Sequence, residues 1–116
     1  MSDIDEPIPY KIMLTPESKK EWNNIDHSIR IQFKKKLQKV RYNPIVPKSK
    51  LSGMTDCYKI KLKRAGYRLV YQVVEDTIQL IVWAVDKRED SKVYDSALKR
   101  LDAVVNKELS ALDLDS

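Results

Sequence analysis

Glycine is scarce in this sequence of 116 residues, which contains only Gly53 and Gly66. A loop that wraps phosphates with consecutive backbone amides needs several glycines, so a Gly-rich nucleotide-binding loop is excluded. The sequence also has a single cysteine, Cys57, and a single histidine, His27. One cysteine rules out a disulfide within the chain and a zinc site built from several cysteines. One histidine rules out acid–base catalysis by a pair of histidines.

Long apolar runs are also missing, and none approaches the roughly 20 residues that a membrane-spanning helix requires. Met1 to Pro9 is acidic and polar and lacks the apolar core of a secretory signal. We therefore expect a cytoplasmic protein without membrane contact. The chain is 42% hydrophobic, which suffices for one modest core, and its length fits one domain.

Positive charge is concentrated in the middle of the chain. The formal net charge is +5, and the segment from His27 to Thr55 contains eight Lys or Arg residues and no Asp or Glu. Acidic residues gather instead near the two ends, for example Asp5 and Asp113. A basic centre of this kind indicates a polyanionic partner such as a nucleic acid. A solvated, lysine-rich helix face is the simpler alternative.

The first half of the chain predicts one strand, Tyr10 to Leu14, followed by two helices. Thr15-Pro16-Glu17 is typical of a helix start, because Thr caps, Pro suits the first turn and Glu favours the positive end of the helix dipole. Asp26 should cap a second helix that ends at Asn43-Pro44. The apolar stripe of this second helix recurs at spacings of three and four: Ile29, Phe33, Leu37 and Val40.

The hydrophobic period changes to two in the second half. Tyr58 to Leu62 alternates apolar residues with lysines, and a similar alternation follows the turn signal Arg64-Ala65-Gly66. Ile78 to Val85 is an almost wholly apolar strand, so three successive strands should form an antiparallel meander. Ser91 should cap a last helix. Its expected apolar stripe consists of Ala97, Leu98, Leu101, Val104 and Val105.

The predicted order is β-α-α-β-β-β-α, which is an α+β domain. We expect a small antiparallel sheet, packed against an N-terminal helical hairpin and joined by a C-terminal helix, with helices covering one face. Residues 1–8 should form a flexible arm, residues 9–107 the single domain, and residues 108–116 a frayed acidic tail.

The hairpin should separate cations from the core. If Ala65-Gly66 is a two-residue loop, Lys63 lies opposite Arg68, and Lys59 and Lys61 project to the same side of the sheet. A slip by one residue would bury lysines, so the alternation selects this register. The cationic face is either merely solvated or a platform for phosphates. The apolar residues should share the other face, against the helices: Tyr58, Ile60, Leu62, Leu69 and Tyr71.

The usual groups of a ribonuclease are missing near this face. His27 lies beside Asp26 at a predicted helix start, where a capping or surface role suits it. No Asp/Glu cluster with metal-binding spacing lies near the lysines, so we expect neither a two-metal mechanism nor any cofactor. If the domain cuts RNA, it must do so with Lys, Arg and Tyr.

Three stretches resemble the RelE family of bacterial toxins: Lys50 to Leu62 (KLSGMTDCYKIKL), Gly66 to Val73 (GYRLVYQV) and Lys87 to Tyr94 (KREDSKVY). The resemblance covers roughly residues 9 to 101. RelE proteins are ribosome-dependent mRNA endonucleases that enter the A site and cleave the codon displayed there. An antitoxin, RelB, wraps and silences them.

The resemblance implies the toxin of a type II toxin–antitoxin system, which inhibits translation by cleaving mRNA without a metal ion. The implied partners are a RelB-like antitoxin, mRNA, and the 30S A site with its rRNA, whereas operator DNA would be contacted only through the antitoxin. The family's functional positions correspond to Lys59, Lys61, Arg68, Arg88 and Tyr94. Further candidates for RNA binding are Lys63, Arg64, Lys34, Lys35 and Lys36.

In the implied reaction the ribose 2′-hydroxyl attacks the adjacent phosphate. Lys59 and Lys61 are candidates for proton transfer and charge stabilisation, and Arg68 suits bidentate contact with the phosphate. Arg88 would act at the leaving oxygen or form a surface ion pair. Tyr94 would stack on a base, orient the 2′-hydroxyl, or serve as a core aromatic of the last helix. The residues do not decide which cation is the base and which the acid.

Trp83 is predicted on the cationic face with Gln79 and Ile81, where either solvent or the antitoxin would cover it. Two rival functions stay open. ParE-like toxins share the scaffold, poison DNA gyrase and lack nuclease activity, and the paired strand lysines and Tyr94 argue against them. A non-catalytic nucleic-acid-binding module would bind in a salt-sensitive way without cleavage.

Overall fold

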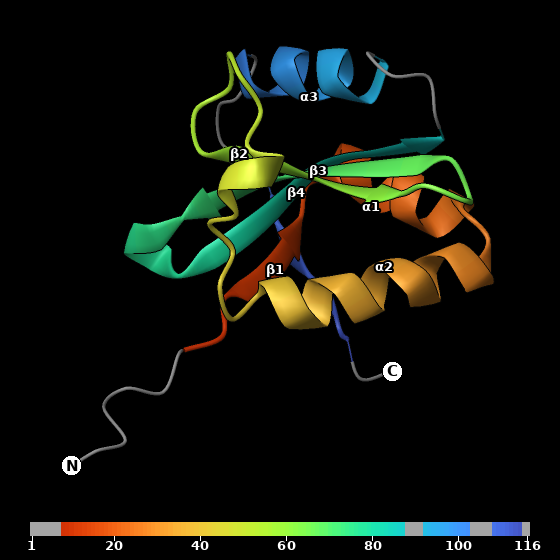
Figure 1. Ribbon diagram of the computed structural model, residues 1–116, viewed down its shortest axis with the longest axis horizontal. Coiled ribbons are helices and arrows are strands. Elements are labelled where there is room, and N and C mark those ends of the chain that lie inside the picture. The colour runs from red at the N-terminus through yellow and green to blue at the C-terminus, as the bar shows by residue number, and fades with distance from the viewer. Residues whose placement is uncertain (1–7, 88–91, 103–107, 115–116) are drawn as a thin grey trace.

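The computed structural model describes residues 8–87, 92–102 and 108–114 (Figure 1). The predicted order of elements is confirmed, with one short strand added at the end of the chain. The elements are β1 Lys11–Leu14, α1 Pro16–Asn24, α2 His27–Val40, β2 Cys57–Leu62, β3 Tyr67–Val74, β4 Gln79–Lys87, α3 Lys92–Asp102 and β5 Ser110–Ala111. Two short 3₁₀ turns, Pro47–Ser49 and Glu75–Thr77, lie in the connections.

The five strands form one sheet in the order β2-β3-β4-β1-β5. β2, β3 and β4 form the predicted antiparallel meander. The prediction of a wholly antiparallel sheet is wrong for β1, which pairs with β4 in parallel, Lys11 lying opposite Gln79. A parallel pair needs a long crossover between its strands. The helical hairpin and the meander together supply that crossover.

Helices cover both faces of the sheet, α1 and α2 on one side and α3 on the other (Figure 1). The α+β class is confirmed, but the expectation that helices cover only one face is wrong. The reason is the second core: Val70, Trp83 and Ala84 are buried on the α3 side together with Val93 and Ala97 of α3. The larger core, on the side of α1 and α2, contains the predicted residues Tyr58, Ile60, Leu62, Leu69 and Tyr71 together with Phe33 and Leu37.

The helix starts agree with the predicted caps. Thr15 caps α1, where its Oγ1 accepts a hydrogen bond from the Ser18 amide at 3.1 Å, and Ser18 Oγ accepts one from the Thr15 amide at 2.9 Å. Asp26 occupies the N-cap of α2 without a side-chain hydrogen bond to the helix. Among the described residues, no helix is long and apolar enough to cross a membrane.

The stripe predicted for α3 is partly wrong. Ala97 is fully buried and Leu101 is half-buried, but Leu98 is 40% exposed. The helix instead buries Val93, because positions 93, 97 and 101 follow one another at a spacing of four along one line of the helix. Ser91, Val104 and Val105 lie outside the described residues.

The hairpin register differs from the prediction by two residues. Leu62 lies opposite Tyr67 and Lys61 opposite Arg68, so the loop contains four residues rather than two, and Lys63 lies in it. The loop closes because Gly66 adopts a φ of +74° and its amide donates to the Leu62 carbonyl at 2.8 Å. A slip of two residues keeps the remaining strand side chains on their predicted faces, but the prediction that Lys63 lies opposite Arg68 on the cationic face is wrong.

The end of the chain does not fray where the structure describes it. β5 pairs with β1, with Ser110 opposite Leu14, and the Leu112 amide donates to the Ile12 carbonyl at 2.9 Å. Leu112 and Leu114 pack against the larger core. Without this strand, β1 would present unpaired backbone groups at the edge of the sheet, which explains the pairing. Of the predicted N-terminal arm, only Ile8 is described, and it is exposed.

Candidate active site

A β-bulge in β4 determines which side chains face α3. Val70 lies opposite Ala84 but Tyr71 lies opposite Val82, so Trp83 is an extra residue in β4. Trp83 and Ala84 therefore belong to the same core, although they are consecutive. The alternation resumes one residue later and brings Asp86 opposite Arg68.

Trp83 lies on the predicted side of the sheet, but the chain itself covers it. The side chain is 4% exposed and packs in the core beneath α3, and its Nε1 donates to Gln72 Oε1 at 3.1 Å. Neither solvent nor an antitoxin is needed to cover it.

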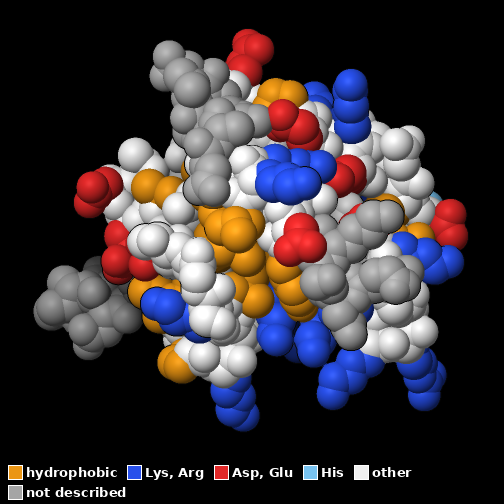
Figure 2. Space-filling model, turned by 90° about the horizontal axis from the view of Figure 1, so that it is seen from above, with side chains coloured by type: hydrophobic (Ala, Val, Ile, Leu, Met, Phe, Trp, Pro, Cys, Tyr) orange, Lys and Arg blue, Asp and Glu red, His pale blue; other side chains and the backbone are white. Residues whose placement is uncertain are grey.

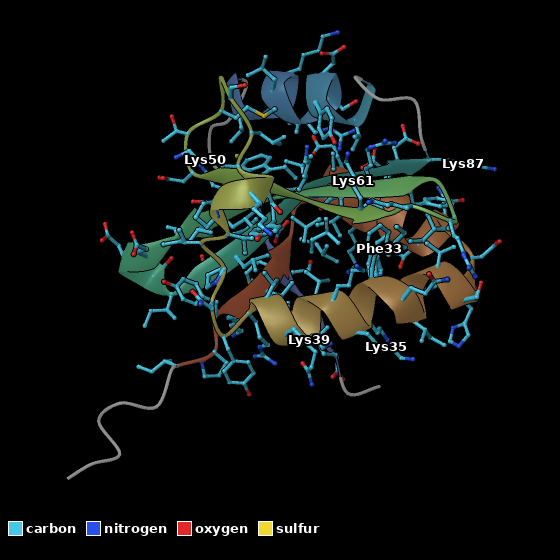
Figure 3. All side chains as sticks on the ribbon, in the orientation of Figure 1. Phe33, Lys35, Lys39, Lys50, Lys61 and Lys87 are labelled. Carbon is cyan, nitrogen blue, oxygen red and sulfur yellow. The ribbon has the colours of Figure 1, made fainter. Side chains whose placement is uncertain are left out.

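The structure brings three of the predicted catalytic residues together on the α3 side of the sheet. Lys61, which is labelled in Figure 3, lies on β2. It is opposite Arg68 of β3, and Lys59 is two residues from it on the same strand. All three are half-buried, and the guanidinium Nε of Arg68 is itself buried. From here on, the cationic face means these three residues, without Lys63.

Tyr94 of α3 lies on the same side of the sheet as the cationic face. It is half-buried and packs against the core formed by Val70 and Trp83. The contact with this core agrees with the alternative that Tyr94 is a core aromatic of the last helix, while its predicted roles at the base or the 2′-hydroxyl stay predictions. Figure 2 views this side of the molecule and shows apolar side chains near its middle, with most Lys and Arg side chains in the lower part.

An ion pair ties α3 to α1. Arg100 Nη1 and Nη2 donate to the two carboxylate oxygens of Glu21 at 2.9 and 2.8 Å. Arg100 Nη1 also donates to the Trp83 carbonyl at 2.9 Å, and Glu21 accepts from the Val85 amide at 3.0 Å. β1 ends before this part of β4, so the pair satisfies backbone groups that no strand reaches. The hydrogen bonds that Arg100 donates to Glu21 raise the pKa of Arg100. No local sequence pattern signals a contact between residues so far apart.

A groove of about 430 Å³ runs between the C-terminal half of α2 and β2. Four lysines line it: Lys36, Lys39, Lys59 and Lys61. We call it the lysine groove. Its other walls include Tyr71, whose hydroxyl donates to the Pro44 carbonyl at 2.9 Å and so anchors the segment that follows α2. Lys39 was not among the predicted RNA-binding residues, although its place on the polar side of the predicted helix could have indicated it.

The other predicted RNA-binding residues lie elsewhere. Lys34 and Lys35 line a second groove, of about 490 Å³, on the outer side of α2. Lys63 and Arg64 are exposed in the hairpin loop. The predicted cations are thus divided among the lysine groove, the outer side of α2 and the hairpin loop. Arg88 lies outside the described residues.

The single cysteine does not contribute a nucleophile to this site. Cys57 is fully buried, and burial, with a smaller effect from Asp56, raises the pKa of its thiol to about 12. The thiol is therefore protonated at neutral pH. Within the part of the chain that the structure describes, no three His, Cys, Asp or Glu side chains form a group that could hold a metal ion.

Comparisons with known proteins agree with this geometry. Residues 12–91 match the family described as ParE toxin of type II toxin-antitoxin system, parDE. A putative RelE-like toxin protein of Escherichia coli is 47% identical over 92 residues, which are 79% of this chain and 97% of that protein. The mRNA interferase toxin RelE of E. coli strain K12 is 50% identical over 82 residues, which are 71% of this chain and 86% of that protein.

Solved structures show the same fold. A mutant of E. coli RelE in the free state superimposes with a TM-score of 0.75 at 44% identity, over 81% of this chain and 99% of that one. The RelE chain of the intact E. coli RelBE toxin–antitoxin complex gives a TM-score of 0.67 at 44% identity, over 69% of this chain and 98% of that one. The chain belongs to the RelE family of toxins of type II toxin–antitoxin systems.

Proposed function

We propose that this protein is an endoribonuclease that cleaves mRNA in the ribosomal A site and thereby inhibits translation. The observation that carries the proposal is the joining of the cationic face to the lysine groove: Lys59 and Lys61 belong to both. The printed name of the relative at 50% identity, mRNA interferase toxin RelE, supports the same activity.

The reaction proposed is attack of the ribose 2′-hydroxyl on the adjacent phosphate. It forms a 2′,3′-cyclic phosphate and releases a 5′-hydroxyl, so it consumes no water, and in this proposal Lys and Arg side chains stabilise the charge in place of a metal ion. Lys59 and Lys61 transfer the proton from the nucleophile and stabilise the additional negative charge. Arg68 holds two phosphate oxygens with its planar guanidinium. Arg88 acts at the leaving oxygen.

Tyr94 orients the 2′-hydroxyl or stacks on a base. Its support is its position, because α3 packs on the side of the sheet that carries Lys61 and Arg68. A half-buried aromatic ring held by a core offers a fixed surface for stacking.

Substrate binding rests on the lysines. Lys36 and Lys39 lie on one wall of the lysine groove and Lys59 and Lys61 on the other, so a phosphate chain lying in it would contact both walls. Lys34, Lys35, Lys63 and Arg64 extend the positive surface toward rRNA. Each phosphate contact releases counterions, so binding should weaken steeply as salt is added.

The ribosome supplies orientation in this proposal. A site without a strong base gains most when the reacting groups are held in position. The partner that silences the toxin is a RelB-like antitoxin, and the support is that the E. coli relative was solved in complex with its antitoxin. Contact with operator DNA runs through that antitoxin, and the protein acts in the cytoplasm.

The test is cleavage of mRNA on purified programmed ribosomes, with 5′ ends mapped to single-nucleotide resolution. We expect cuts in phase with the codon in the A site, and the cleavage rate of Lys61→Ala should fall by at least 100-fold, the usual lower range for general acid–base groups. The matched control is Lys20→Ala, an exposed lysine on α1. Equal rates for Lys61→Ala and wild type would contradict the assignment.

The match of residues 12–91 to a family described as ParE toxin favours a second candidate, inhibition of DNA gyrase. The two functions separate cleanly in parallel assays of mRNA cleavage and of plasmid supercoiling by gyrase. Loss of supercoiling at protein concentrations that leave mRNA intact would replace the nuclease proposal with this one.

A further inference from the structure

Asp86 is the only acidic residue in the described strands β1 to β5, and it lies on the side of the sheet that carries the cationic face. The β-bulge at Trp83 puts it there, since strict alternation through β4 would give that place to Val85. The row across the sheet is Lys61 on β2, Arg68 on β3 and Asp86 on β4. A carboxylate beside a phosphate-binding surface weakens the attraction for RNA, so its presence there calls for a compensating role.

We propose that Asp86 is a positioning residue for Arg68: when RNA is bound, its carboxylate holds the guanidinium in the orientation that meets the scissile phosphate. The inference rests on the nuclease proposed above. Directly opposite residues of antiparallel strands have Cβ atoms about 5 Å apart, which is within reach of an Arg–carboxylate contact.

Two of the described arginines lie near Asp86: Arg68, directly opposite it on β3, and Arg100, whose pKa it helps to raise. One oxygen, Oδ1, accepts from the Lys87 amide at 2.7 Å, which fixes the carboxylate at the end of the strand. The other guanidinium nearby belongs to Arg100, and it already donates to Glu21 and to the Trp83 carbonyl. Asp86 is half-buried, so water screens its contact with a neighbouring charge less than it would on an open surface.

Asp86→Asn separates the two effects of the carboxylate. Asn has the same shape and keeps an oxygen for the Lys87 amide, so the fold should be retained. Loss of one negative charge should lower KM for programmed ribosomes, because the RNA-binding surface becomes more positive. Loss of the hold on Arg68 should lower kcat by about 10-fold, the order that one hydrogen bond to a charged group gives. A merely structural role would not lower KM and kcat together.

Two comparisons make the test specific. Asp76→Asn removes the same charge in an exposed turn at the other end of β4, so its kcat should equal that of wild type. Arg68→Lys keeps the charge but not the planar guanidinium. In this background Asp86→Asn should change kcat by less than about 2-fold, because the effects of substituting two residues that act as a unit do not add. The same 10-fold loss in both backgrounds would overturn the inference.

The affinity for an RNA with a 2′-deoxy nucleotide at the scissile position gives a readout that does not depend on cleavage. Asp86→Asn should tighten this binding less in wild type than in Arg68→Lys, because only the wild type also loses the hold on Arg68. If wild type fails to cleave, the proposed function fails, while the coupling of affinities still decides the inference. Equal changes of affinity in both backgrounds would overturn it, whatever the activity.

Discussion

Arg100→Ala should lower the free energy of unfolding by about 2 to 3 kcal/mol. The change removes hydrogen bonds of 2.9 and 2.8 Å to Glu21 and one of 2.9 Å to the Trp83 carbonyl. A hydrogen bond to a charged group contributes roughly 1.5 to 3 kcal/mol. The two side chains are 21% and 27% exposed, so solvent screens part of this attraction and the loss stays at about 2 to 3 kcal/mol, well below the sum for three such bonds.

Thermal unfolding followed by circular dichroism measures the loss, which should appear as a Tm lower by about 10 °C for a domain of this size. The control is Lys99→Ala, which removes an exposed cation from the same helix. Amide exchange adds a local readout, because α3 should open more readily once its tie to α1 is lost. A Tm within 2 °C of wild type, or an equal fall for Lys99→Ala, would refute the structural role of the ion pair.

Three further predictions concern the groove and the buried groups. Lys36→Ala combined with Lys39→Ala should weaken RNA binding and reduce the slope of log K against log salt by about 2, measured by titration at several salt concentrations; an unchanged slope would place the RNA elsewhere. Tyr71→Phe should lower stability by about 1 kcal/mol in denaturant unfolding, because the Pro44 carbonyl loses its buried donor; no loss would mean that water replaces the hydroxyl. The raised pKa of Cys57, from 9.0 to about 12, means that the folded state keeps a proton that the unfolded state releases. Stability should therefore be fully present below pH 9 and fall between pH 9 and 12, and Cys57→Ala should show a smaller fall over that window.

Part of this structure could be predicted from short stretches of sequence. Thr15 caps α1, the stripe of Ile29, Phe33 and Leu37 is buried, and the lysines of β2 face away from the larger core. These features depend on side-chain direction, which repeats every 3.6 residues in a helix and every two in a strand. The resemblance to RelE, carried by residues of the hairpin, was confirmed by the comparisons.

The remaining features depend on contacts between distant parts of the chain. The hairpin loop contains four residues rather than two because Gly66 closes it against Leu62, which the alternation of apolar residues could not reveal. Likewise β5 forms because the edge of β1 is otherwise unpaired, although nothing in its own two residues favours a strand.

The candidate site shows the same division. The alternation of residues was enough to place Lys59, Lys61 and Arg68 on one face, because that placement survives a slip of two residues. The folded chain was needed to show that α3 covers that side of the sheet and that a bulge brings Asp86 opposite Arg68. A bulge is a response of one strand to the packing of its neighbours, so the pattern of β4 alone does not show where it lies.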